Sequence, residues 1–145
     1  SASSMRFINL NQNTSTIYIS NEKAPQKGYK SLDMGIIHPA TLVPKSIYKQ
    51  IGNYDDRFSI MADIDWFIRA CKTHQPIYSS TIVSTNMCYG GISTTSQFKK
   101  LYKERTMLYK KHTRNLIEEK LYLSKWCIRH FKNTLYTKIK SLKHK

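Results

Sequence analysis

Two aspartates, Asp63 and Asp65, interrupt a stretch of sequence that otherwise has the composition of a buried core. Most of their neighbours between residues 57 and 74 are large and apolar: Phe58, Ile60, Met61, Ile64, Trp66, Phe67 and Ile68. Removing a carboxylate from water among such residues is costly unless it is paired or used in chemistry. Each aspartate therefore needs either a structural contact or a task such as proton transfer.

A helix that begins near Ala62 or Asp63 gives both aspartates a structural role. Asp63 would lie at the helix start, where a carboxylate binds free backbone N–H groups and suits the helix dipole. Asp65 and Arg69 stand at positions i and i+4, which is the spacing of an ion pair along one helix face. The sequence offers Asp63 no such partner, so Asp63 is the aspartate that we expect to face a cleft.

The cysteines and histidines offer little metal chemistry. Cys71 and His74 form a C-x-x-H pair, but no second pair completes a zinc site, so we expect no zinc. The three cysteines, Cys71, Cys88 and Cys127, are odd in number and widely spaced. This usage argues against a disulfide framework and favours a reducing compartment.

Strands and helices alternate along the chain, which predicts the α/β class. The strand signals lie at about residues 5–10 and 15–20, with one or two further strands within 77–89. Helix signals lie at about residues 45–51 and 63–74, and from residue 97 almost to the end, with a break near 112–114. These strands are too few for a complete doubly wound sheet.

The chain has 145 residues and a formal net charge of +15, and the charge is unevenly distributed. Residues 99–145 hold 15 Lys and Arg against 3 Glu, a net charge of +12. Such a basic segment fits two partners, nucleic acid phosphates or the anionic face of a membrane. No apolar run reaches 18 residues, so we expect no membrane-spanning helix.

The basic segment has the pattern of an amphipathic helix over residues 113–145. Its apolar residues recur at spacings of three, four and seven: Ile117, Leu121, Ile128, Phe131, Leu135, Ile139 and Leu142. One interpretation is a helix that lies on a membrane surface; the other is a helix that packs on protein and exposes a basic face. Nucleic acid is disfavoured, because no nucleic-acid-binding module is recognisable.

Four segments carry a more specific pattern in their order and spacing. They are HPAT at residues 38–41, SIYKQIGNYDDRF at 46–58, ADIDWFIR at 62–69 and CYGGIST at 88–94. Together they resemble the second half of family 2 glycosyltransferases of the GT-A fold, a Rossmann-like α/β fold, in the type that builds bacterial polysaccharides. The resemblance covers about residues 33–112.

The resemblance implies roles for individual residues. By position in ADID, Asp63 is the catalytic base, which deprotonates the acceptor hydroxyl as it attacks the anomeric carbon with inversion. Asp65 and Arg69 remain a structural ion pair. His38 is expected near the floor of the active site, with Gly90, Gly91 and Ser93 beside acceptor or donor. The simpler alternatives are that His38 packs locally and that the two glycines make a turn.

The metal motif of the family is not found where it is expected. A D-x-D motif should precede the first strands and hold Mn or Mg against the donor diphosphate, but residues 1–32 contain no aspartate. Asp63-Ile64-Asp65 matches D-x-D in its letters only. We therefore expect the divalent metal in the full-length enzyme and none bound by this chain, which would lack the donor-binding half and be inactive alone.

The resulting prediction is the C-terminal half of a GT-A domain followed by C-terminal helices. Residues 1–112 form the acceptor-side part, and residues 113–145 form the basic amphipathic helix. Donor and acceptor are expected to be a nucleotide sugar and a saccharide or lipid-linked sugar, at the cytoplasmic face of the membrane. The alternatives are a non-catalytic basic module that binds nucleic acid or an anionic membrane, and a degenerate, inactive remnant of the enzyme.

Overall fold

The structure is a computed structural model that describes residues 2–9, 14–18, 36–74, 77–88, 97–113 and 115–142. The chain divides into two compact units, Ser1–Glu104 and Arg105–Lys145, called here the N-terminal and C-terminal units. The division falls within a helix, whereas the boundary predicted at residue 112 coincides with the end of that helix. The turn that is the simpler alternative for Gly90 and Gly91 lies outside the described residues.

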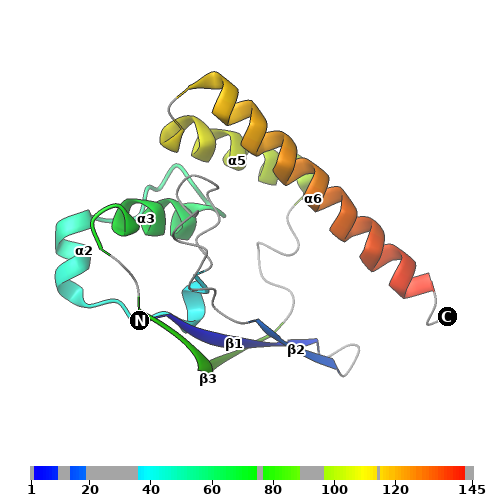
Figure 1. Ribbon diagram of the computed structural model, residues 1–145, viewed down its shortest axis with the longest axis horizontal. Helices are drawn as coiled ribbons and strands as arrows, with labels where there is room; N and C mark the ends of the chain where they lie inside the picture. Colours follow the sequence, from blue (N-terminus) through cyan, green and yellow to red (C-terminus); the bar gives the residue numbers. More distant parts are fainter. Residues whose placement is uncertain are drawn as a thin grey trace. The chain divides into compact units, whose positions relative to one another are not determined.

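Three strands form one mixed sheet in the N-terminal unit. They are β1 (Ala2–Asn9), β2 (Thr14–Tyr18) and β3 (Tyr78–Cys88), in the order β2-β1-β3 (Figure 1). Strand β1 pairs antiparallel with β2 and parallel with β3. A parallel pair needs a long crossover connection, and here the intervening chain carries the helices of the unit. The assignment to the GT-A fold itself stays a prediction.

A short 3-10 helix, η1 (His38–Ala40), follows the start of this connection. Pro39 occupies its first turn, where its missing N–H costs no hydrogen bond. The Thr85 hydroxyl on β3 donates to the Pro39 carbonyl at 2.9 Å, and the Thr41 hydroxyl donates to the Ile37 carbonyl at 2.8 Å. These bonds fix the backbone on both sides of His38.

Helix α2 (Lys45–Ile51) begins and ends where the sequence predicts. Pro44 is its N-cap with φ −60°, and Gly52 is its C-cap with φ +82°. Glycine is favoured there because a side chain makes positive φ unfavourable. Helix α3 (Ala62–Cys71) then begins at Ala62, as expected from the aspartate pattern.

Most of the buried apolar side chains of the N-terminal unit come from α3 and the residues just before it. These are Phe58, Met61, Trp66, Phe67, Ile68 and Ala70, and the others are Met5 on β1 and Ala40 on η1. Helix α3 is enclosed on most of its surface, since none of its residues is exposed and the buried ones include the charged Asp65.

The start of α3 is capped by a residue that is distant in sequence. The side chain of the N-cap residue, Met61, makes no hydrogen bond to the first turn. Instead, the buried carboxylate of Glu104, on α5 (Phe98–His112), accepts hydrogen bonds from the N–H groups of Ile60 at 2.8 Å and Met61 at 3.0 Å. It also accepts the Ser59 hydroxyl at 2.6 Å. A carboxylate at this helix end also suits the dipole.

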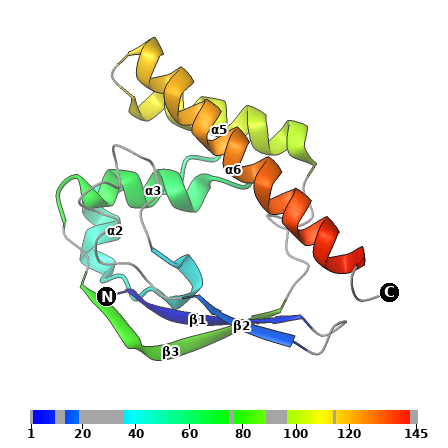
Figure 2. The same ribbon diagram turned by 45° about the vertical axis from the view of Figure 1, so that its right-hand side comes forward.

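The C-terminal unit is a helical hairpin made by the second part of α5 and by α6 (Leu116–Leu142). The side chain of Asn115 accepts the Glu118 N–H at 2.9 Å and so begins α6 after the predicted break. The Arg105 guanidinium lies 5.5 Å from the Trp126 ring, and the Tyr109 and Tyr122 rings are 6.1 Å apart. Later residues of α5 thus contact earlier residues of α6, which shows that the two helices run antiparallel (Figure 2). Among the helices described, none combines the length and apolarity needed to cross a membrane.

We predict that Glu104→Gln lowers the free energy of unfolding by about 1–2 kcal/mol at pH 7, the scale of a lost charged cap. Burial acts to raise the pKa of Glu104, but its hydrogen bonds from Ser59, Ile60 and Met61 outweigh that effect and hold the pKa below its usual value. Because the folded pKa is lowered, this stabilisation is present above the ordinary glutamate pKa of about 4.3 and is lost as pH falls through the folded value.

Urea unfolding of both proteins at pH 7 and at about pH 3 measures this effect. The difference between wild type and Glu104→Gln should shrink at the lower pH. Asp56→Asn removes one exposed carboxylate and is the matched control, which should differ little from wild type at pH 7. A difference that is the same at both pH values contradicts the capping role.

Candidate active site

The buried aspartate of the pair is Asp65, and it holds Arg69. The Asp65 side chain is 0% exposed, and its Oδ2 lies 3.0 Å from Arg69 Nε. The other guanidinium nitrogens donate to the carbonyls of Ile51 and Asn53, both at 2.7 Å. Arg69 is therefore a bridge between α3 and the end of α2, because the last carbonyls of a helix have no partner within it.

Trp66 strengthens the same connection. Its indole Nε1 donates to the Gly52 carbonyl at 2.8 Å, between the two carbonyls that Arg69 binds. Three consecutive carbonyls, from Ile51 to Asn53, are thus held by two side chains of α3. We call this set of contacts the α2–α3 bridge. It fixes the backbone immediately before Tyr54.

Asp63 lies at the start of α3 and divides its two oxygens between two tasks. Its Oδ1 accepts the Ile64 N–H at 2.8 Å, which satisfies one free donor of the first turn. Its Oδ2 faces His38, at 3.7 Å from Nδ1. The Asp63 side chain is 36% exposed, whereas Asp65, which has the same apolar neighbours in sequence, is completely buried.

His38 is the partner that the sequence did not offer to Asp63. Its ring packs edge-on against Phe67, with centroids 5.6 Å apart, while 45% of its side chain stays exposed. Its second nitrogen, Nε2, lies 3.4 Å from the Tyr54 hydroxyl. The imidazole therefore lies between a carboxylate and a phenol, with an open side toward solvent.

Tyr54 continues the polar contacts away from His38. Its hydroxyl lies 3.2 Å from that of Tyr48, whose ring stacks on Trp66 with centroids 4.5 Å apart. Burial raises the pKa of Tyr54 to about 12, and its bond to Tyr48 and the nearby Asp63 charge act in the same direction. Tyr54 thus stays protonated over the physiological range. We call Tyr48, Tyr54, His38 and Asp63 the polar row.

The polar row has the components of a proton-transfer site. Among the described residues, no backbone N–H binds Oδ2 of Asp63, which lies next to the imidazole of His38, and both side chains are partly exposed. A hydroxyl that approaches this point would meet an acceptor on Asp63 and a ring nitrogen on His38 within hydrogen-bond range. The structure places His38, which the resemblance put near the floor of the active site, next to Asp63, and the roles of both residues stay predictions.

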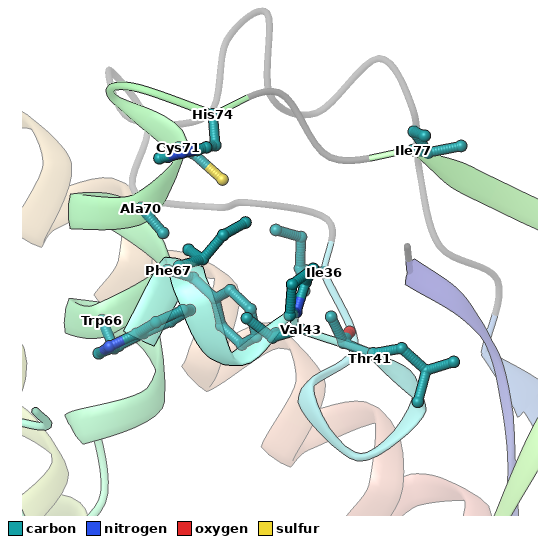
Figure 3. A pocket seen from close by; sticks show the side chains of 12 residues that line it. Ile36, Thr41, Val43, Trp66, Phe67, Ala70, Cys71, His74 and Ile77 are labelled. Carbon is teal, nitrogen blue, oxygen red and sulfur yellow. The ribbon is translucent and has the colours of Figure 1, made fainter. Parts of the chain in front are cut away.

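A separate apolar pocket of about 220 Å³ has Phe67 in its lining. Figure 3 shows Trp66, Phe67, Ala70 and Cys71 along α3, facing the chain around Ile36, Thr41 and Val43. The full lining is Ile36, Thr41, Leu42, Val43, Pro44, Ile47, Trp66, Phe67, Ala70, Cys71, His74 and Ile77. Asp63 and His38 do not belong to it, so its chemistry differs from that of the polar row.

Cys71 is unsuited to nucleophilic chemistry in this pocket. Burial raises the pKa of the Cys71 thiol to about 11, so the thiolate that would attack a substrate is scarce near neutral pH. His74, the other member of the C-x-x-H pair, has its Nδ1 2.8 Å from the Thr73 hydroxyl. The pocket can therefore accept an apolar group, but it offers no activated nucleophile.

Two tyrosines and one glutamate of this region were not assigned roles from sequence. Tyr48 and Tyr54 belong to one of the four recognised segments, and their spacing around Gly52 is the only local signal. Glu104 is a single carboxylate in a strongly basic helix, which could have marked it as a paired residue. The predicted binding residues Gly90, Gly91 and Ser93 lie outside the described residues.

Comparisons of the chain with protein-family models, with curated proteins and with solved structures found no match. The resemblance to family 2 glycosyltransferases therefore rests on the four segments alone. Within the residues that the structure describes, no group of three or more His, Cys, Asp or Glu side chains could hold a metal ion. The described residues therefore offer no set of ligands for the divalent metal that the resemblance implies.

We predict that Asp65→Asn lowers the free energy of unfolding by about 3 kcal/mol, the scale of breaking a buried ion pair by removing one partner. An exposed pair at this spacing would cost less than about 1 kcal/mol, but the complete burial of Asp65 excludes that smaller value. Asp56→Asn, which removes an exposed carboxylate, is the control and should cost under about 0.5 kcal/mol. Chemical unfolding measures both, and equal costs contradict the bridge.

Proposed function

We propose that the chain is the acceptor-side part of a family 2-like glycosyltransferase, in which Asp63 is the general base. The reaction would transfer a sugar from a nucleotide-sugar donor to a saccharide or lipid-linked acceptor with inversion. The proposal joins the four sequence segments to one structural observation. That observation is the position of Asp63 Oδ2, which lies in a partly exposed side chain at a helix start, 3.7 Å from His38 Nδ1.

The contrast between the two aspartates supports Asp63 over Asp65. Asp65 is buried and already bound to Arg69, so it has neither solvent access nor a free role. Asp63 keeps one oxygen on a backbone N–H, which orients the carboxylate, and directs the other outward. A base needs this combination of fixed geometry and access to the proton that it removes.

In the proposed step the acceptor hydroxyl gives its proton to Asp63 Oδ2. The hydroxyl oxygen forms the new bond to the anomeric carbon, and the bond from that carbon to the diphosphate breaks on the opposite face. The electron pair leaves with the nucleoside diphosphate. The donor and its divalent Mn or Mg would be held outside the residues described here, where the metal would supply charge stabilisation of the leaving group.

A second proposal concerns the partner of α6, because its apolar stripe is open to solvent. Ile117, Leu121, Ile128, Phe131 and Leu135 are between 48% and 79% exposed, while Trp126 on the opposite side faces α5. Lys120, Lys125 and Lys132 are exposed beside this stripe. An exposed apolar stripe with basic flanks fits the anionic surface of a membrane. We therefore propose peripheral attachment at the cytoplasmic face of the membrane, near lipid-linked acceptors.

We predict that Asp63→Asn reduces sugar transfer by about 100-fold or more, the usual scale for loss of a general base. The amide keeps the shape and the hydrogen bond from Ile64 but cannot take the proton. Donor binding should change little. The measurement is kcat in the complete gene product that contains these residues, with a panel of nucleotide sugars and manganese.

Asp56→Asn is the matched control, because Asp56 is an exposed carboxylate outside the polar row. Its kcat should equal that of wild type. Sugar transfer that survives Asp63→Asn, or that is lost equally in both variants, would overturn the assignment of Asp63. A gene product without transfer activity toward any donor would favour the alternative of an inactive remnant.

For α6, we predict binding to anionic lipid vesicles that weakens as salt rises. Each lysine near the surface contributes about 1 kcal/mol, screened over about 8 Å at physiological salt. The apolar stripe adds about 25 cal/mol per Å² that it buries. Leu135→Asp should therefore weaken binding at every salt concentration, whereas Lys125→Gln with Lys132→Gln should matter mainly at low salt.

The matched control is Asn133→Asp, which adds the same charge at an exposed position away from the stripe. It should weaken binding much less than Leu135→Asp at high salt. Vesicle sedimentation with anionic and neutral lipids measures all variants. Equal binding to neutral and anionic vesicles, or tighter binding to RNA than to anionic lipid, would contradict the membrane proposal.

A further inference from the structure

The negative charge of the Asp63 carboxylate determines which group donates and which accepts in each hydrogen bond of the polar row. His38 Nδ1 lies 3.7 Å from the Asp63 carboxylate, which only accepts hydrogen bonds. A neutral imidazole carries one proton, and placing it on Nδ1 turns a repulsion between two lone pairs into an attraction. The other nitrogen, Nε2, is then an acceptor, so the Tyr54 hydroxyl at 3.4 Å donates to it.

Tyr54 can hold that direction throughout a reaction. Its hydroxyl donates to His38 only while it is protonated, and burial raises the pKa of Tyr54 to about 12. The Tyr48 hydroxyl at 3.2 Å can donate to the Tyr54 oxygen in turn. Every proton of the row then points toward Asp63. The α2–α3 bridge fixes the backbone before Tyr54, and the Tyr48 ring stacks on Trp66, so the row has a rigid support.

His38 and Asp63 leave a position for one acceptor oxygen beside the line that joins Nδ1 to Oδ2, because these two atoms are too close for an oxygen to fit between them. With Nδ1 and Oδ2 3.7 Å apart, a single hydroxyl oxygen can lie at about 2.8 Å from each of them. Such an oxygen would accept from the Nδ1–H and donate to Oδ2. Both side chains are partly exposed, 45% for His38 and 36% for Asp63, so a substrate can reach this point.

We propose that His38 is a second catalytic residue, which binds the acceptor hydroxyl oxygen through Nδ1–H while Asp63 removes its proton, and that Tyr54 is the positioning residue that sets the His38 tautomer. The inference rests on the proposed glycosyl transfer and assigns the acceptor group as a sugar hydroxyl.

The chemistry of this pair is complementary. As the acceptor proton passes to Asp63 Oδ2, negative charge develops on the acceptor oxygen. The Nδ1–H of His38 stabilises that charge without giving up its proton, in the manner of an oxyanion-hole donor. The oxygen then bonds to the anomeric carbon of the nucleotide-sugar donor, and the nucleoside diphosphate leaves with the electron pair of the broken bond.

The tautomer can be measured without any activity. Nitrogen NMR of the 145-residue chain, at about pH 8 where an ordinary histidine is neutral, distinguishes protonated from unprotonated ring nitrogens. The His38→Gln variant identifies the His38 signals. We expect His38 to carry its proton on Nδ1, in contrast to the Nε2–H form that free histidine favours. A predominant Nε2–H form in the wild-type chain would overturn the inference.

Tyr54→Phe tests the positioning role, because it keeps the ring and removes only the hydroxyl. The Nδ1–H population of His38 should fall, and kcat in the complete gene product should fall by about 10-fold, the scale of losing a group that orients a catalytic residue. Tyr136→Phe, at an exposed position on α6, is the matched control and should change neither quantity. If Tyr54→Phe also leaves both unchanged, the positioning role is overturned.

Two substitutions of His38 separate the roles of its nitrogens. In His38→Asn the amide nitrogen takes the position of the ring nitrogen Nδ1. In His38→Gln the amide nitrogen takes the position of Nε2. His38→Gln should therefore lower kcat by about 100-fold, the scale of losing one oxyanion donor, while His38→Asn should retain about 10-fold more activity than His38→Gln. Equal activities, or a more active His38→Gln, would overturn the donor role.

The same assays distinguish this inference from the proposed function. If Asp63→Asn abolishes transfer but both His38 variants remain fully active, the glycosyl transfer proposal stands and only the role of His38 fails. If Asp63→Asn is as active as wild type, the proposed function fails and the role of His38 fails with it.

Discussion

The N-terminal unit depends on the guanidinium of Arg69. One side of it is bound by Asp65, which is completely buried, and the other nitrogens take the carbonyls of Ile51 and Asn53. A buried carboxylate and the free carbonyls of a helix end are each unfavourable alone, and Arg69 satisfies both at once. The end of α2 and the face of α3 are therefore fixed to each other. The position of Tyr54, and through it of His38, follows from that connection.

Three carboxylates of this unit have contrasting environments. Asp65 and Glu104 are buried and fully used by the fold, one by an arginine and the other by backbone N–H groups at the start of α3. Asp63 is the exception, because it gives only one oxygen to the backbone and keeps the other near solvent. The Asp65–Arg69 pair and the hydrogen bonds of Glu104 hold the start of α3 in place. A rigid turn is what a base needs to meet its substrate in a defined geometry.

Local patterns predicted the elements well, and distant contacts explain where the predictions fell short. Pro44 and Gly52 marked both ends of α2, and the spacing of Asp65 and Arg69 indicated their pair, because these signals act within a few residues. The sequence did not show which aspartate is buried, since apolar neighbours in sequence surround both equally. His38 lies 16 residues before Tyr54, and Glu104 lies more than 40 residues beyond the turn that it caps. Only the folded chain brings such groups together.

The two tryptophans of the chain are divided between its two units. Trp66 belongs to the α2–α3 bridge, and Trp126 lies in the hairpin beside Arg105. Both are buried, so each indole changes its surroundings when its own unit opens. Intrinsic fluorescence is consequently a sum of two independent reporters. A protein that keeps Trp66 alone, and another that keeps Trp126 alone, would resolve whether the units unfold together or in separate transitions.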